Sequence, residues 1–220
     1  MRTEGRIKMK PITKIFLGII VVLVLVGGYF VYDKFIKPRS NKAKIVDSIS
    51  NKDVDYVVSD TDTKLFKENF NELKKILNAK EVDNKKYAET LTKLFVIDFF
   101  TLSNKTSKND IGGVQFVYDG YKASFVESAR DSFYRQVRST INDEKANVSL
   151  PTVTKVKIDD IDEISPSNVF EDFGFTEDQV GYIVNISWEY KNKDDYQDNA
   201  TIIIVPDGKK LSVGRMQEAM

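Results

Sequence analysis

The chain has 220 residues, of which 41% are hydrophobic, and its 33 basic and 33 acidic side chains give a formal net charge of zero. Fourteen phenylalanines can build a substantial core, which argues against global disorder. The balanced charge argues against nucleic-acid binding by the whole chain, so no direct nucleic-acid partner is expected. The length suits one domain of ordinary size plus a membrane anchor.

The chain contains neither cysteine nor histidine. Disulfides, thiol nucleophiles, zinc sites built on thiolate or imidazole, the serine triad and imidazole acid–base catalysis are therefore excluded. Carboxylate pairs, Ser–Lys pairs and oxygen-ligated metals remain open. We expect no cofactor, no metal and no enzyme activity.

Residues 15–32, with the sequence IFLGIIVVLVLVGGYFVY, form an uncharged apolar run. As a helix this run would be about 27 Å long, close to the hydrocarbon thickness of a bilayer. Tyr29 and Tyr32 stand where an interfacial aromatic belt would lie. A cleaved signal peptide is the alternative, since residues 26–28 resemble a cleavage site, but the apolar run continues beyond them. The sequence predicts a single-pass transmembrane helix, with the lipid bilayer as a partner.

Basic residues flank this run in nearly equal number, so the positive-inside count alone does not orient it. Residues 1–14 are interpreted as a cytoplasmic basic tail, because a tail outside would have to carry its charges across the membrane. Residues 33–44 include the polar stretch KPRSNKAK and are interpreted as a stalk. Residues 45–220 are then an extracytoplasmic domain attached to the cell membrane.

The first part of this domain is predicted to be helical, because apolar residues recur at helical spacing. The second segment starts at a capping residue, Asp62 or Thr63, and the third has an apolar surface broad enough for a central core helix. In the first segment the apolar positions are sparse. The expected helices cover residues 44–58, 62–77, 84–102 and 120–141.

After residue 150 the pattern changes to alternating strands and turns. A short helical turn should open at Ser165-Pro166 and close at Gly174, and residues 206–209 form a strong turn. The expected strands cover residues 155–159, 182–190, 200–205 and 211–216. Helices followed by an antiparallel meander predict an α+β domain, with the helices packed on one face of a curved antiparallel sheet.

Asp98 interrupts the apolar sequence LFVIDFF and is the one candidate pocket acid. A buried carboxylate with a raised pKa could act as a general base. The alternative places Asp98 at the rim of its helix, paired with a lysine or an arginine. A single acid without a partner motif favours this ion pair.

Other polar and aromatic features are interpreted as structural. The acidic clusters at 159–163 and 194–198 lack the glycine and the distant glutamate of a calcium-binding EF-hand loop, so we interpret them as solvated loops. Gly112-Gly113 lacks the context of a phosphate loop and indicates a tight turn. Three aromatic residues of the sheet are candidates for a protein contact, although core packing is expected for at least one of them: Tyr182, Trp188 and Tyr190.

The order of segments resembles a known family. A basic tail, one apolar helix, a stalk, helices and a curved sheet are typical of the VirB-eight-like bitopic scaffold subunits of bacterial type IV secretion and conjugation machines. The stretch LFVIDFFTLSNKTSKNDIGG, followed by GYKASFVESARDSFYRQV, is similar to that family's helix–loop–helix before its sheet. The resemblance is one of topology. It implies a domain of the nuclear-transport-factor-two-like fold and transfers no binding residue.

Two functions from different classes follow. The resemblance implies a non-catalytic scaffold that self-associates and binds other membrane subunits of a secretion complex. The same fold also holds small-molecule binders and isomerases, so an extracytoplasmic ligand-binding or pocket enzyme domain is the alternative. The absence of histidine and cysteine favours the scaffold.

Overall fold

An antiparallel hairpin begins the part of the chain that the computed structural model describes, which comprises residues 43–50, 54–137, 150–170, 175–191 and 196–217. Strands β1 (Ile45–Ser50) and β2 (Asp55–Ser59) form this two-stranded sheet. The helix predicted for residues 44–58 is therefore wrong. The side chains of Val54, Tyr56 and Val58 are buried, and this repeat of two residues is that of a strand.

Helix α2 (Lys64–Leu77) confirms the second predicted helix. The side chain of Thr63 caps it by accepting a hydrogen bond from the Phe66 backbone N–H at 3.2 Å. Such a cap satisfies one of the amides that a helix leaves unpaired at its start. Phe66, Phe70 and Leu73 are buried, so the apolar stripe that predicted the helix also packs it.

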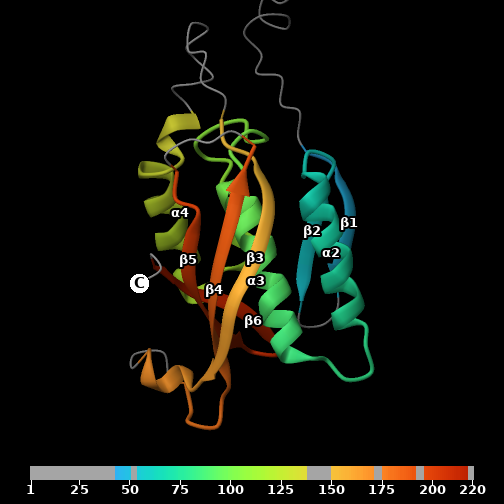
Figure 1. The fold of residues 1–220 in the computed structure, drawn as a ribbon, viewed down its shortest axis with the longest axis vertical. Helices are drawn as coiled ribbons and strands as arrows, with labels where there is room; N and C mark the ends of the chain where they lie inside the picture. The colour runs from blue at the N-terminus through green and yellow to red at the C-terminus, as the bar shows by residue number, and fades with distance from the viewer. Residues whose placement is uncertain (1–42, 51–53, 138–149, 171–174, 192–195, 218–220) are drawn as a thin grey trace, which may run out of the picture. The chain divides into compact units, whose positions relative to one another are not determined.

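Helix α3 (Asn84–Phe100) is the central element of the core, as its broad apolar surface predicted. Asp83 caps its start by accepting a hydrogen bond from the Lys86 backbone N–H. The helix ends two residues before the predicted boundary, because Thr101 has an extended backbone. In Figure 1, α3 lies behind β3 and β4, and it packs against all four strands of the main sheet.

Helix α4 (Lys122–Asp131) is shorter than the predicted helix of residues 120–141. A 3₁₀ turn, η3 (Asp119–Tyr121), precedes it, and Ser132 leaves the helical conformation at φ −114° and ψ −99°. Helical backbone resumes at residues 135–137. The interruption turns Tyr134 inward. Its backbone N–H donates to the Ala129 carbonyl, five residues back, instead of the Arg130 carbonyl that a regular α-helix would use. Residues 138–149 lie outside the described part.

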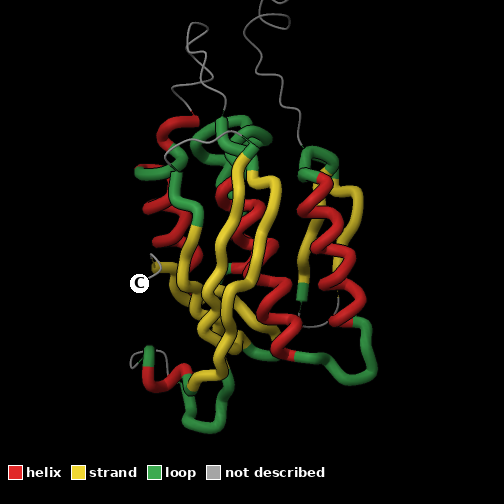
Figure 2. Tube along the Cα trace, in the orientation of Figure 1, coloured by secondary structure: helices red, strands yellow, loops and turns green. Residues whose placement is uncertain are grey.

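Four antiparallel strands form the main sheet, in the order β3-β4-β5-β6 (Figures 1 and 2). Every strand pairs with its neighbour in the chain, so the predicted meander and the α+β class are confirmed. Gly208 closes the last turn with a left-handed φ of +65°. The strands are β3 (Val153–Ile164), β4 (Gly181–Tyr190), β5 (Asn199–Asp207) and β6 (Lys210–Gln217).

Two further 3₁₀ turns connect these elements. One is η2 (Val114–Phe116), which follows the Gly112-Gly113 turn. The other is η4 (Pro166–Asn168), where the predicted turn opens with proline in its first residues. Gly174, the residue predicted to close that turn, lies outside the described residues.

Apolar side chains pack on both faces of the sheet. The main core fills the space between the sheet, α3, α2 and the β1–β2 hairpin. A smaller cluster of Phe170, Ile203 and Val205 covers part of the opposite face. The guanidinium of Arg215 lies 4.7 Å from the centre of the Phe170 ring, which places a cation over an aromatic face.

Among the described helices, none is long and apolar enough to cross a bilayer. The anchor predicted at residues 15–32 lies outside the described part of the chain, as do the basic tail and nearly all of the stalk.

Candidate functional site

Asp98, the candidate pocket acid, has a basic partner. Its Oδ1 accepts a hydrogen bond from Lys105 Nζ at 2.6 Å, and its Oδ2 accepts one from the Gly113 backbone N–H at 2.7 Å. The side chains of Lys105 and Asp98 are 6% and 14% exposed, so the ion pair is largely shielded from water. Both carboxylate oxygens are thus engaged, and the pair joins the end of α3 to the loop that follows it.

The Gly112-Gly113 turn packs directly against this carboxylate. A Cβ at residue 112 would lie 2.2 Å from the Asp98 carbonyl oxygen, and Gly113 has a left-handed φ of +77°. The Gly112 N–H donates to the Tyr134 hydroxyl at 2.9 Å, and that hydroxyl donates to the Phe99 carbonyl at 2.8 Å. Burial raises the pKa of Tyr134, so this hydroxyl keeps its proton. The turn is a structural one, as its sequence indicated.

The candidate contact aromatics lie mostly inside the protein. Tyr182 and Trp188 are each 4% exposed, and the Trp188 ring lies 4.4 Å from the ring of Phe100 on α3. Tyr190 is half-buried, and its hydroxyl donates to the Gln197 carbonyl at 2.7 Å. Burial raises the pKa of Tyr190 to about 12. The expectation of exposed sheet aromatics is therefore wrong for Tyr182 and Trp188, because their face of β4 is the one that packs on α3.

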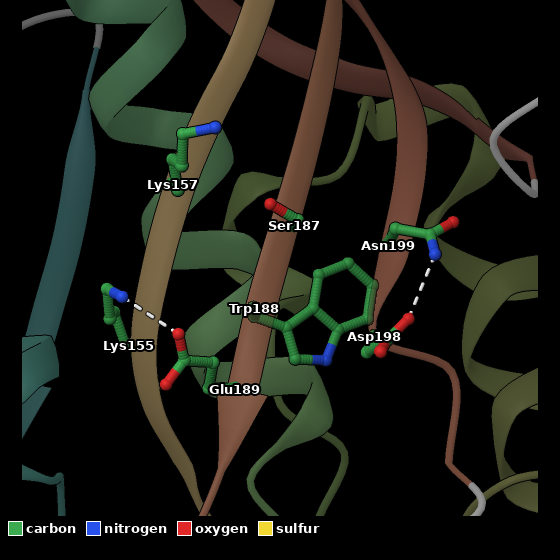
Figure 3. Close-up of a pocket in the computed structure, with 7 residues that line it drawn as sticks. All are labelled: Lys155, Lys157, Ser187, Trp188, Glu189, Asp198 and Asn199. Atoms are coloured by element: carbon green, nitrogen blue, oxygen red, sulfur yellow. Dashed lines mark hydrogen bonds and ion pairs between the residues drawn. The ribbon is translucent and has the colours of Figure 1, made fainter.

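Polar side chains line a depression of about 240 Å³ over β3, β4 and β5 (Figure 3). Lys155 Nζ lies 2.8 Å from Glu189 Oε1, and Lys157 Nζ lies 2.6 Å from Asp159 Oδ1. Each lysine thus has a carboxylate partner that compensates its charge. Neither lysine therefore presents an unpaired positive charge to an ionic ligand. The lining residues are Lys155, Lys157, Ser187, Trp188, Glu189, Asp198 and Asn199.

The acidic cluster at 159–163 lies within strand β3, so its interpretation as a loop is wrong. In the pairing with β4, Asp160 and Asp162 lie opposite Asn185 and Ile183, on the face away from α3, whereas Glu163 lies opposite the buried Tyr182. Among the described residues, no three acidic side chains gather closely enough to hold a metal ion. Asp194 and Asp195 lie outside the described part.

A second and larger cavity, which we call the aromatic cavity, lies between the end of α3, helix α4 and the last strands. Its volume is about 470 Å³. Within the described part of the chain, no charged side chain lines it, and Asp98 is not part of its wall. The aromatic cavity is lined by Phe99, Phe100, Phe125, Ser128, Ala129, Ser132, Phe133, Tyr196, Gln197 and Met216.

Sequence reasoning missed this cavity because its walls come from segments far apart in the chain. The predicted stripe of the fourth helix included Phe125, Ala129 and Phe133, and these residues do face the core. The break at Ser132, which sets the position of Phe133 relative to Phe125, has no signal in the hydrophobic spacing. Tyr196 and Met216 approach from the other side of the cavity only through the sheet topology.

A buried tyrosine pair also escaped prediction. The hydroxyls of Tyr56 and Tyr87 lie 2.9 Å apart, and the Tyr56 hydroxyl donates to the Leu211 carbonyl at 3.2 Å. Burial raises the pKa of both tyrosines, so the pair is neutral and ties β2, α3 and β6 together. The alternation of apolar residues at 54, 56 and 58 was the available signal for the strand that places Tyr56 here.

No protein family, curated protein or solved structure matches this chain.

Proposed function

We propose that this chain is a bitopic, non-catalytic scaffold of a bacterial type IV secretion or conjugation machine. In this proposal residues 15–32 anchor the chain, its N-terminus is cytoplasmic, and residues 45–220 form an extracytoplasmic nuclear-transport-factor-two-like domain. The apolar run in the sequence supports the anchor. The packing of α3 against one face of an antiparallel meander supports the fold.

An exposed apolar pair on β1 carries the proposal. Ile45 and Val46 are 66% and 56% exposed, and they are the two neighbours among the exposed large hydrophobic residues of the described part. A register shift between Ile45 and Asp47 turns both consecutive side chains outward. The pair directly follows the predicted stalk, which would hold it close to the membrane surface.

The outer edge of the neighbouring strand is already occupied. The Val57 backbone N–H donates to Gln115 Oε1 at 2.9 Å, and Gln115 Nε2 donates to the Val57 carbonyl at 3.2 Å. The Gln115 side chain thereby takes the place of a further strand beside β2. The hairpin thus presents β1, with its exposed apolar pair, as the edge that can meet a partner protein.

A membrane tether makes a small contact of this kind effective. Confinement of two partners to one surface raises their effective concentration, so weak contacts suffice for assembly. The partners in this proposal are other copies of the chain and the other membrane subunits of the machine. Tyr182 and Trp188 contribute to the scaffold by holding the sheet on α3, not by contacting a partner.

The test replaces single exposed apolar residues by lysine and measures crosslinked complexes in membranes together with conjugative transfer. Val46→Lys should reduce both the crosslinked complexes and the transfer severalfold, because burial of a lysine charge against a partner protein is unfavourable. Val180→Lys is the matched control, since Val180 is 46% exposed and lies far along the chain from β1.

Introduced cysteines give a second measurement, because the chain has none of its own. Val46→Cys should crosslink within membranes and Val180→Cys should not. The proposal is wrong if Val46→Lys leaves complexes and transfer unchanged in a chain that still folds, as judged by circular dichroism.

A further inference from the structure

We propose that β1 pairs edge to edge with β1 of a second copy of this chain, in antiparallel orientation, so that the two hairpins form one continuous sheet. The inference rests on the proposed function, because it names the partner that meets the same edge. Its evidence is separate, since it comes from the backbone direction and the charge of β1. Within the described part of the chain, β1 is the strand edge best suited to such a partner.

The other strand edges of the described part are occupied or protected. Gln115 bonds to Val57 at the outer edge of β2. At β6, the Tyr118 backbone N–H donates to the Val213 carbonyl at 2.9 Å. Strand β3 has two irregularities in its register with β4 and carries several exposed charges, and both features oppose the pairing of sheet edges. The exposed charged residues of β3 are Lys155, Lys157, Asp159, Asp160, Asp162 and Glu163.

Ser48 directs its backbone to the open edge of β1. It lies opposite Val57, whose N–H and carbonyl bond to Gln115 and therefore point away from β1. In an antiparallel pair, two opposite residues either bond to each other or both point outward, so the Ser48 N–H and carbonyl point away from β2. The Ser48 N–H donates to Asp47 Oδ1 at 2.8 Å. A further strand exchanges this local bond for one to its own carbonyl, so the N–H stays satisfied.

The charge of β1 favours an identical partner. Asp47 is the one ionisable residue of this strand, and Lys74 Nζ lies 2.6 Å from Asp47 Oδ1. The hydrogen bond from Lys74 lowers the pKa of Asp47, so the ion pair persists at neutral pH. Two β1 edges can therefore meet without repulsion between like charges. A register centred on Ser48 also separates the two Asp47 side chains, because each then lies opposite Ile49 of the other copy.

The occupied edge of β2 limits the assembly to two copies. Pairing of β1 with β1 uses the open edge of both hairpins, and Gln115 holds the outer edge of each β2. Such a contact is two-fold symmetric, with the same surface on each side, and it closes without growing into a fibre. The predicted stalk ends directly before β1, so two anchored copies present this edge at a similar distance from the membrane.

The first test uses two differently tagged copies of the full chain in one membrane and measures how much of one copurifies with the other. Ser48→Pro in both copies removes the outward N–H without removing a bond to β2, and proline is tolerated at such edge positions. We expect copurification to fall about tenfold. Ser48→Ala is the matched control, because it keeps the N–H and loses only the hydroxyl, and it should copurify like the wild type.

A second measurement does not depend on the folding of the proline variant. Ser48→Cys introduces one cysteine into a chain that has none. In the register centred on Ser48, the two Cα atoms lie about 5.5 Å apart, within the range of a disulfide. Oxidation in membranes should therefore give a product with twice the mass of the chain. Val180→Cys, at a position that is 46% exposed, should stay uncrosslinked.

Equal copurification of the Ser48→Pro and Ser48→Ala chains, both folded by circular dichroism, would overturn the pairing. So would the absence of a Ser48→Cys product in a chain that unfolds as cooperatively as the wild type. A product formed with a different membrane protein would contradict this proposal and leave the proposed function intact. Conversely, pairs that form as expected while Ser48→Pro and Val46→Lys leave conjugative transfer unchanged would support the pairing and contradict the proposed function.

Discussion

Asp98 shows how much one residue in an apolar stretch reveals. Its position predicted either a pocket base or an ion pair, and the partner is Lys105, seven residues further along the chain. That partner could not be identified from helical spacing, because the chain leaves the helix at Thr101 and folds back through a loop. The glycine that donates to Asp98 was visible in the sequence as a turn, but its target was not.

Asp62, close to this ion pair, should make stability depend on pH. Burial raises the pKa of Asp62 from its ordinary 3.8, and the negative charge of Asp98 raises it further. The folded state therefore holds this proton more tightly than the unfolded state. The associated stability is complete below about pH 4 and is lost as the pH rises through the folded pKa.

Asp62→Asn should abolish this decline, because asparagine stays neutral and its amide oxygen can still accept the Ser59 N–H bond. The measurement is urea unfolding at a series of pH values. Asp83→Asn is the control with the opposite sign, because a hydrogen bond from the Lys86 backbone lowers the pKa of Asp83. Loss of the Asp83 carboxylate should remove stability that is present above its unfolded pKa. Identical slopes for Asp62→Asn and the wild type would contradict the expectation.

At the scale of elements, capping residues and apolar spacing predicted correctly those helices and strands that pack on the core through one face. The capped start and apolar stripe of α2 and the alternation of β4 and β5 were sufficient to predict those elements. The β1–β2 hairpin was mistaken for a helix because Ile45, Ile49 and Val57 also match helical spacing. The hairpin is held as two strands by contacts of β2 with α3 and η2. These contacts join residues far apart in the sequence, so the spacing of apolar residues does not reveal them.

Gln115 is the residue that should matter most for the hairpin. Gln115→Ala removes both of its hydrogen bonds to Val57 and should destabilise β2 by about 1–3 kcal/mol. Hydrogen exchange at the Val57 amide, measured by NMR, should speed up accordingly. Asn71→Ala, at an exposed position on α2, should change the stability by less than about 0.5 kcal/mol. Unchanged protection of Val57 would show that its amide is held by other means.

At the scale of the whole molecule, the described residues belong to one compact unit, Ala43–Met220. The α+β class and the order of the four-stranded meander followed from the change of periodicity after residue 150. The aromatic cavity and the second core did not, because both depend on how distant segments meet across the sheet.

A domain that begins at Asn41 should be soluble and unfold in one cooperative transition. Phe95 is fully buried, so Phe95→Ala should cost about 3–5 kcal/mol. Phe133 is half-buried in the wall of the aromatic cavity, so Phe133→Ala should cost clearly less. Urea denaturation of both variants tests this order. Equal losses would mean that Phe133 is as enclosed as Phe95.

The hydrogen bond between Tyr56 and Leu211 has a consequence for biosynthesis. It joins a residue near the start of the described domain to one in its last strand. A chain still on the ribosome cannot close this core until β6 has emerged, although α2 and α3 can already pair with each other. Until then the tyrosine pair of β2 and α3 lacks its contact with the Leu211 carbonyl, although α3 and η2 can already pack against the hairpin. Release of the last strand is therefore the step that completes the hydrogen bonding of this tyrosine pair during synthesis.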